Sequence, residues 1–144
     1  MTKRFRIISI FGALMLTLIF FGTSSCDKYS SPRKVKRIIT QGTWALSSAF
    51  IDNVNATADY TDYQFRFQED GDIVILGDAA VSGIWSTGIE KDPTFLSVTI
   101  TPFFPFYNLN ADWEIQEIKT DRIMMQLNGG SAVDVLIFKQ VATN

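Results

Sequence analysis

The stretch DYQFRFQEDGDIVILG, residues 62–77, is the part of the chain that most clearly predicts the fold. In its first half Tyr63, Phe65 and Phe67 fall on one side, and polar side chains fall on the other. This period of two, built on aromatic residues, is typical of a half-buried β-strand. An acidic turn at 69–72 follows, in which Gly71 is available for a positive φ, and an apolar run leads back to residue 77. Residues 62–77 are therefore predicted to form a β-hairpin.

Alternation of the same kind covers most of the chain after residue 41. It predicts six further strands, at 42–52, 81–87, 94–101, 111–119, 122–128 and 132–141. Four of these six strands gather apolar side chains on one face. In chain order these are Trp44, Leu46 and Phe50, then Leu96, Val98 and Ile100, then Trp113 and Ile115, and finally Ile123, Met125 and Leu127.

Eight consecutive strands joined mostly by short turns predict an all-β domain over residues 38–144. Closure into an eight-stranded antiparallel up-and-down β-barrel would leave no unpaired strand edge. A two-sheet β-sandwich is the alternative. A barrel of this size would have an interior just large enough for side chains or for one small ligand. Before the first strand, SPRKVKRIIT (31–40) could form one helical turn.

Residues 1–25 have the three parts of an export signal peptide. Lys3, Arg4 and Arg6 form a basic start, an apolar block runs over residues 7–21, and small polar residues follow. The apolar block is shorter than the ~20 residues that span a bilayer comfortably. We therefore predict a cleaved signal, with an uncleaved membrane anchor as the alternative.

Cys26, the only cysteine, follows this segment directly. Its position resembles the bacterial lipobox, in which the thiol is acylated and the chain is cut before the cysteine. Thr23, three positions earlier, fits the looser lipobox of Bacteroidetes. Acylation by palmitate-type chains would account for the absence of a partner cysteine and would hold a small domain at a membrane. An incidental free thiol is the alternative.

The charges are segregated along the chain. Loss of residues 1–25 would remove three of the 13 basic residues and leave a net charge of about −5. The predicted lipidated N-terminus and basic tether, 26–37, holds five bases, whereas 38–144 holds five bases and 14 acids. A net-acidic domain is a poor nucleic-acid binder, so we expect no nucleic-acid partner. The bases could form a solvated tether or contact anionic headgroups.

The sequence offers little catalytic chemistry. It has no histidine, and acylation would remove its one thiol. The carboxylates of the 69–72 turn lack the ligand spacing of a known calcium loop. We therefore expect no catalytic residues, no metal site and no cofactor, and predict that the protein is not an enzyme.

An aromatic stretch, TPFFPFYNLN (101–110), interrupts the alternation. It places Phe103, Phe104, Phe106 and Tyr107 around two prolines, which a central strand does not accommodate. One interpretation is an aromatic lip at a barrel mouth that contacts a ligand, a partner or the membrane. The other is a loop folded over one end of the barrel, where it covers core residues.

Together these features resemble the lipocalin-like lipoproteins of Bacteroidetes over residues 38–140. The resemblance is carried by the lipobox, GTWAL at 42–46, FRFQEDG at 65–71, GIW at 83–85, WEIQEIKTDRIMMQL at 113–127 and the final LIFK. It implies a small barrel that binds a ligand, with Trp44 of the Gly-x-Trp motif closing one end. Arg122 is the candidate arginine that packs against this tryptophan.

Two hypotheses of function follow. In the first, a lipid-anchored barrel binds a small apolar or amphipathic molecule in its interior, lined by Trp44, Phe65, Phe67, Trp85 and Trp113. In the second, these side chains fill the barrel, which then serves as a non-enzymatic interaction or accessory module of the cell envelope. Both place the protein at the outer membrane, on its periplasmic or surface face, and the second predicts an envelope protein as partner.

Overall fold

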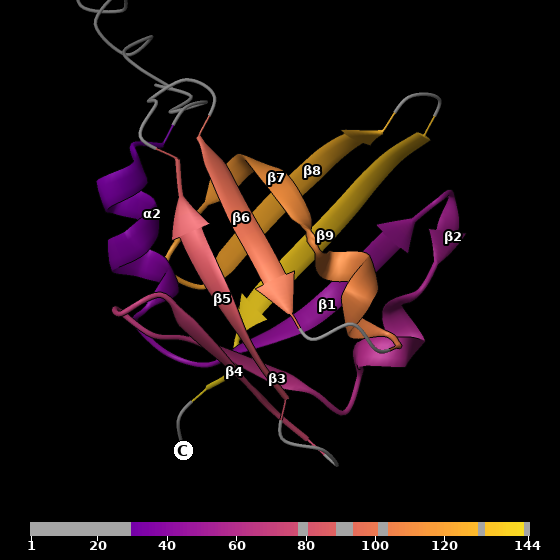
Figure 1. Ribbon diagram of the computed structural model, residues 1–144, viewed down its shortest axis with the longest axis horizontal. Helices are drawn as coiled ribbons and strands as arrows, with labels where there is room; N and C mark the ends of the chain where they lie inside the picture. Colours follow the sequence, from indigo (N-terminus) through magenta and orange to yellow (C-terminus); the bar gives the residue numbers. More distant parts are fainter. Residues whose placement is uncertain (1–29, 78–80, 89–93, 101–103, 130–131, 143–144) are drawn as a thin grey trace, which may run out of the picture.

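The computed structural model describes residues 30–77, 81–88, 94–100, 104–129 and 132–142 (Figure 1). The predicted signal segment, Cys26 and Phe103 lie outside these residues.

Nine strands form one antiparallel sheet that closes on itself. They are β1 (Trp44–Ile51), β2 (Val54–Asn55), β3 (Gln64–Phe67), β4 (Asp72–Leu76), β5 (Val81–Thr87), β6 (Phe95–Ile100), β7 (Ala111–Ile118), β8 (Arg122–Gly129) and β9 (Ala132–Gln140). Strands β1 and β3–β9 pair in chain order, β1 also pairs with β9, and the two-residue β2 is added to β1. The predicted eight-stranded up-and-down barrel is therefore confirmed, with one additional short strand.

The hairpin of β3 and β4 has the predicted form. Phe65 pairs with Ile75 and Phe67 with Ile73, and all four side chains are buried. Gly71 in the turn has a φ of 99°, a conformation that glycine adopts more readily than other residues. The turn is fixed to the barrel because the backbone N–H of Trp85 donates to the Gly71 carbonyl oxygen at 2.7 Å.

Strand β1 departs from simple alternation. Its pairing with β9 shifts register between Leu46 and Ser48, which is the signature of a β-bulge. Trp44 and Leu46 point inward before the bulge, and Ala49 and Ile51 do so after it. The prediction that Phe50 shares the inward face was therefore wrong: Phe50 is 44% exposed, because one extra residue reverses the phase.

The segment after β1 forms a short hairpin and a 3-10 helix. Asp52 and Asn53 both have positive φ, 52° and 63°, as the two-residue turn of a β-hairpin requires. This turn joins β1 to β2, and the short 3-10 helix η1 (Thr57–Tyr60) follows. The segment is tied to β1 because the Ala56 N–H donates to the Ala49 carbonyl oxygen at 2.9 Å.

A helix, α2 (Pro32–Ile39), precedes the barrel. Ser31 caps its first turn, since its hydroxyl accepts from the Lys34 N–H at 3.3 Å, and proline occupies the first helical position. Val35, Ile38 and Ile39 are buried against the barrel. An eight-residue helix is marginal alone, so this packing stabilises it.

Helix α2 corrects the predicted tether and the domain boundary. Residues 32–37 belong to the folded unit, as does Ser30, whose carbonyl accepts from the Thr94 hydroxyl and which is only 6% exposed. The helix has two turns rather than one because its apolar residues meet the barrel, a contact that local sequence does not reveal. Ser30 and residues 32–37 therefore belong to the folded domain rather than to a tether.

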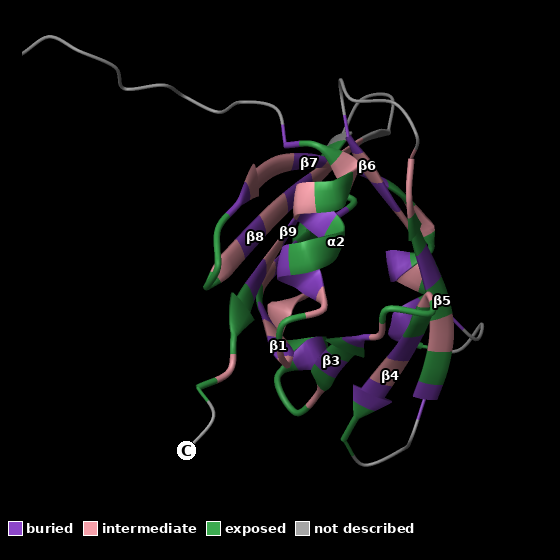
Figure 2. Cartoon of the chain, turned by 90° about the vertical axis from the view of Figure 1, so that its left-hand side faces the viewer, coloured by how far each residue is buried: buried purple, intermediate pink, exposed green. Residues whose placement is uncertain are grey.

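The two ends of the barrel differ. At the α2 end, where the 68–71 and 119–121 turns lie, the helix crosses in front of the ring of strands, as Figure 2 shows. At the far end, where the 52–53 turn and η1 lie, the chain between β6 and β7 forms the 3-10 helix η2 (Phe106–Leu109). Phe106 and Leu109 of η2 are buried. Both ends of the interior are therefore covered by chain.

Candidate functional site

Within the part of the chain that the structure describes, apolar side chains pack together in the barrel interior, the first site predicted. One cavity of about 10 Å³ lies among the described residues of the interior, a volume comparable to the space one water molecule needs. Its lining is entirely apolar: Phe65, Phe67, Ile73, Val98, Ile100, Leu109, Trp113, Met125, Leu136 and Phe138. Such a cavity offers water no hydrogen-bond partner and offers a lipid-sized ligand no room.

Phe65, Phe67 and Phe138 form the centre of this packing. The Phe138 ring meets Phe65 at a centroid distance of 5.3 Å and Phe67 at 6.1 Å, both nearly perpendicular. These are the edge-to-face contacts that aromatic pairs prefer. The two predicted interior phenylalanines are therefore in the core, each at most 3% exposed.

The three tryptophans use their indole N–H groups to hold the chain at the barrel ends. Trp44 donates to the Ile39 carbonyl oxygen at 2.8 Å and so fixes the end of α2. Trp113 donates to the Leu109 carbonyl oxygen at 2.8 Å and fixes η2. Trp85 donates to the Gln68 carbonyl oxygen at 3.0 Å and fixes the β3–β4 turn. Each indole N–H is thus satisfied within the protein and none is left for a ligand.

The aromatic stretch divides between its two interpretations. Phe106 is 1% exposed and packs edge-on against Tyr63, at a centroid distance of 4.9 Å, so this part covers the barrel end. Phe104 and Tyr107 are 61% and 49% exposed, with ring centroids 6.4 Å apart. The lip predicted from the sequence is therefore reduced, among the described residues, to these two side chains.

Tyr60 fastens the aromatic stretch to η1. It is fully buried, and its hydroxyl donates to the Pro105 carbonyl oxygen at 2.9 Å. Burial, together with the nearby Asp59 carboxylate, raises the pKa of Tyr60 from 10.0 to about 12. The phenol is thus neutral, and its hydrogen bond to Pro105 holds the segment that carries Phe104 and Tyr107.

The far end gathers exposed apolar side chains. Of the seven large apolar residues that are exposed in the described chain, Ile84 lies along β5 and the others lie at strand ends or in connections of the far end: Phe50, Val54, Leu76, Phe104, Tyr107 and Val133. Sequence reasoning found only the two aromatic residues of the β6–β7 connection. It missed Phe50, whose exposure depends on the bulge. The Asp52–Asn53 pair was a usable signal for the hairpin that carries Val54.

A surface cleft lies at the α2 end of the barrel. It is a cleft of about 270 Å³, open to solvent and lined by Lys36, Glu69, Asp70, Gly71, Trp85, Ser86 and Thr87. It lies between α2 and the β3–β4 turn, so Lys36 lines one side and Glu69 and Asp70 line the other. Sequence reasoning missed this cleft because it considered residues 26–37 a free tether.

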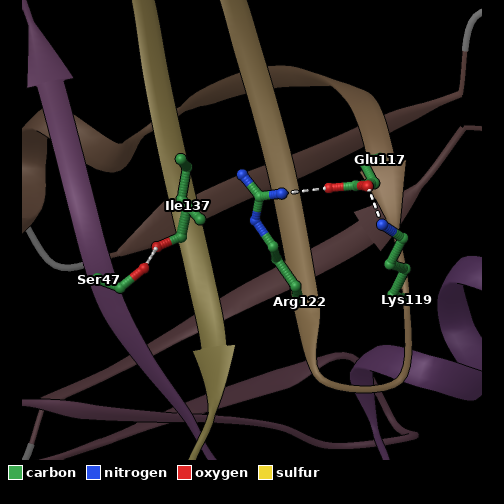
Figure 3. A network of polar contacts seen from close by, with 5 residues as sticks. All are labelled: Ser47, Glu117, Lys119, Arg122 and Ile137. Carbon is green, nitrogen blue, oxygen red and sulfur yellow. Dashed lines mark hydrogen bonds and ion pairs between the residues drawn. The ribbon is translucent and has the colours of Figure 1, made fainter.

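Arg122 does not have the predicted role. Its Nη1 atom donates to Glu117 Oε2 at 2.8 Å, and Lys119 Nζ lies 2.5 Å from Glu117 Oε1 (Figure 3). The hydrogen bond from Lys119 lowers the pKa of Glu117. Arg122 precedes the inward-pointing Ile123 and so faces outward, on the opposite side of the sheet from Trp44. The indole of Trp44 has the Ile39 carbonyl as its partner instead.

Ser47 lies at the β1 bulge and makes a hydrogen bond on the same outer surface. Its hydroxyl donates to the Ile137 carbonyl oxygen at 3.0 Å, as Figure 3 also shows. These polar contacts join neighbouring strands on the barrel wall.

Within the described residues, no helix is both long and apolar enough to span a membrane, and no group of three or more metal-ligating side chains comes together. Comparisons of the chain with protein-family models, with curated proteins and with solved structures returned no match. The resemblance to lipocalin-like lipoproteins therefore stays a prediction from sequence motifs.

Proposed function

We propose that this protein is a lipid-anchored component of a bacterial envelope whose filled barrel serves as a non-enzymatic interaction module. By this we mean that its outer surface, rather than its interior, binds another molecule. The observation that supports the proposal is the packed interior, with an apolar cavity of about 10 Å³ and chain covering both ends.

The filled interior favours this function over storage of a ligand. A pocket for a drug-sized molecule is usually 300–1,000 Å³ in volume. An apolar ligand inside this barrel would have to displace several core rings, each of which contributes several kcal/mol of packing, roughly 3–5 for a phenylalanine. A ligand as small as one acyl chain would not compensate for that loss without a different arrangement of the strands.

The proposed anchor depends on Cys26, which stands four residues before the first described residue, Ser30. Acyl chains there would attach the protein next to the start of α2. Metabolic labelling with palmitate tests this part directly. We expect the wild-type chain to incorporate label and Cys26→Ser to lose it, and equal labelling of both would refute the anchor.

The proposed interaction surface is the apolar far end, and Phe104 with Tyr107 is its most exposed aromatic pair. Aromatic residues that protrude from a fixed base are frequent centres of protein interfaces. Tyr60, Phe106 and the buried side of η2 supply that fixed base.

Site-specific photo-crosslinking in cells tests the surface. A benzophenone amino acid would replace Phe104, Tyr107 or, as a matched control, Ile84, which is 60% exposed but lies along β5. We expect one discrete protein adduct, the same from positions 104 and 107 and absent from position 84. The surface assignment would be refuted by adducts that are equal at all three positions, or by none at the far end.

A further inference from the structure

We infer that the outward face of α2 binds the anionic headgroups of a bilayer, so that the α2 end of the barrel lies against the membrane and the far end points away from it. The inference rests on the proposed acyl anchor, and it adds an orientation and a lipid class that the anchor alone does not specify.

The geometry of the helix separates its charges from its apolar side chains. At about 100° per residue, Val35, Ile38 and Ile39 fall on one side, which is the side buried against the barrel. Arg33 and Arg37 are one turn apart and fall at the centre of the opposite side. Lys34 and Lys36 flank them, so three exposed positive charges and the half-buried Lys34 lie on the side of the helix away from the barrel.

These cations are available to an external anion. None of the four forms an ion pair within the described part of the chain, where the two ion pairs found both involve Glu117. Of the four, Lys36 lines the cleft to which Glu69 and Asp70 also contribute. The two arginines therefore carry the inference, and a guanidinium can bind a phosphate through two parallel hydrogen bonds.

The partner's charge follows from the contrast with the rest of the domain. Residues 38–144 hold five basic and 14 acidic side chains, so the α2 face is a cationic surface on an acidic barrel. An anionic bilayer attracts that face and repels most of the remainder, which orients the molecule as well as binding it. An acidic protein would have the same sign of charge, but only the bilayer is brought to α2 by the proposed attachment at Cys26.

The helix is also placed for such a contact. It lies in front of one end of the barrel, as Figure 2 shows, and its Arg33, Lys36 and Arg37 are exposed. The Ile39 carbonyl is held by Trp44 and the Ser30 carbonyl by Thr94, so both ends of the helix region are fixed to the barrel. A membrane contact by α2 would therefore fix the orientation of the whole domain.

The test measures orientation in the acylated, full-length mature protein on floated vesicles. A unique nitroxide label is placed on a cysteine introduced at Thr120, in the α2-end turn, or at Val54, in the far-end hairpin. Vesicles of phosphatidylcholine alone, or with 30% phosphatidylglycerol, carry a nickel-chelating lipid whose paramagnetism reports distance from the bilayer. The variant is Arg33→Gln/Arg37→Gln, and the matched control is Arg66→Gln/Lys139→Gln on the barrel wall.

We expect phosphatidylglycerol to bring the Thr120 label, but not the Val54 label, closer to the bilayer. The effect should disappear in the double-arginine variant and persist in the control, and the variant should lose about 30-fold in its preference for anionic vesicles. Raised ionic strength should weaken the effect in the wild type. Label positions that ignore phosphatidylglycerol, or a control that behaves like the variant, would overturn the inference and favour an acidic protein as the partner.

The acyl anchor and the α2 inference can be refuted separately. Flotation on pure phosphatidylcholine depends on the acyl anchor alone, so its absence would refute the anchor. If the unanchored protein still binds anionic vesicles through Arg33 and Arg37, the α2 inference stands without the anchor. If the full-length mature protein floats on neither kind of vesicle, both the anchor and the α2 inference are wrong.

Discussion

Phe138→Ala would remove an aromatic ring from the centre of the barrel and so measures how tightly the interior is packed. Phe138 is 3% exposed, lines the small cavity, and contacts the rings of Phe65 and Phe67. Truncation loses the transfer free energy of the ring and leaves a space that the strands of a closed barrel cannot collapse to fill. We expect a loss of about 3–5 kcal/mol in the free energy of unfolding.

Phe138→Leu is the matched control for this change. It keeps an apolar side chain of intermediate size and should cost about 1–2 kcal/mol. Urea unfolding followed by tryptophan fluorescence gives both values, and the alanine variant should melt roughly 15–30 °C lower than the wild type. The dependence on urea should keep its slope if the folded and unfolded states are otherwise unchanged.

Benzene provides a second measurement on the same proteins. The space left in Phe138→Ala, on the order of 100 Å³ and apolar, should bind benzene, as engineered apolar cavities do. At ten times its dissociation constant benzene should restore about 1.4 kcal/mol to the alanine variant and nothing to the wild type. A truncation cost below about 1 kcal/mol, or stabilisation of the wild type by benzene, would refute the packed interior.

Three further changes test the contacts that close the barrel. Tyr60→Phe should cost about 1–2 kcal/mol because it removes the hydrogen bond to Pro105. Since burial raises the pKa of Tyr60 from 10.0 to about 12, the phenol's contribution is complete below pH 10 and is lost as the pH rises through 12. Alkaline urea titrations should therefore show a loss of about 2–3 kcal/mol between pH 10 and 12 in the wild type that is missing in Tyr60→Phe; parallel curves would contradict this. Trp44→Phe should free the Ile39 carbonyl and raise amide hydrogen exchange in α2 more than in β8, whereas uniform exchange would disprove the fastening role. Gly71→Ala should cost about 1–2 kcal/mol by thermal unfolding because φ at residue 71 is 99°, and an unchanged melting temperature would argue against that turn.

The fold was predictable where side-chain alternation is local and undisturbed. The strands around Phe65, Val98 and Met125 keep a period of two over their whole length, and their inward faces were predicted correctly. The positive φ of Gly71 followed from the same pattern. Phe50 was misplaced because a bulge adds a residue without changing the composition of the strand.

The remaining features depend on contacts between distant segments. Helix α2 is too short for a periodic signal, and it exists because Val35 and Ile39 meet a surface made by other strands. The volume of the interior is likewise the result of rings such as Phe65 and Phe138 meeting across strands 73 residues apart in the chain. Sequence therefore left open whether the barrel is a cup or a filled core, and it left both interpretations of the aromatic stretch open for the same reason.

The anchor and the orientation concern how the protein sits in the envelope, whereas the packed interior decides what kind of protein it is. Native mass spectrometry of the mature acylated protein, isolated from its own cells in a mild detergent, tests that point most directly. We predict a mass equal to the acylated chain alone, unchanged when the protein is unfolded and measured again. A stoichiometric small molecule that is bound in the native spectrum and released on unfolding would contradict the filled barrel.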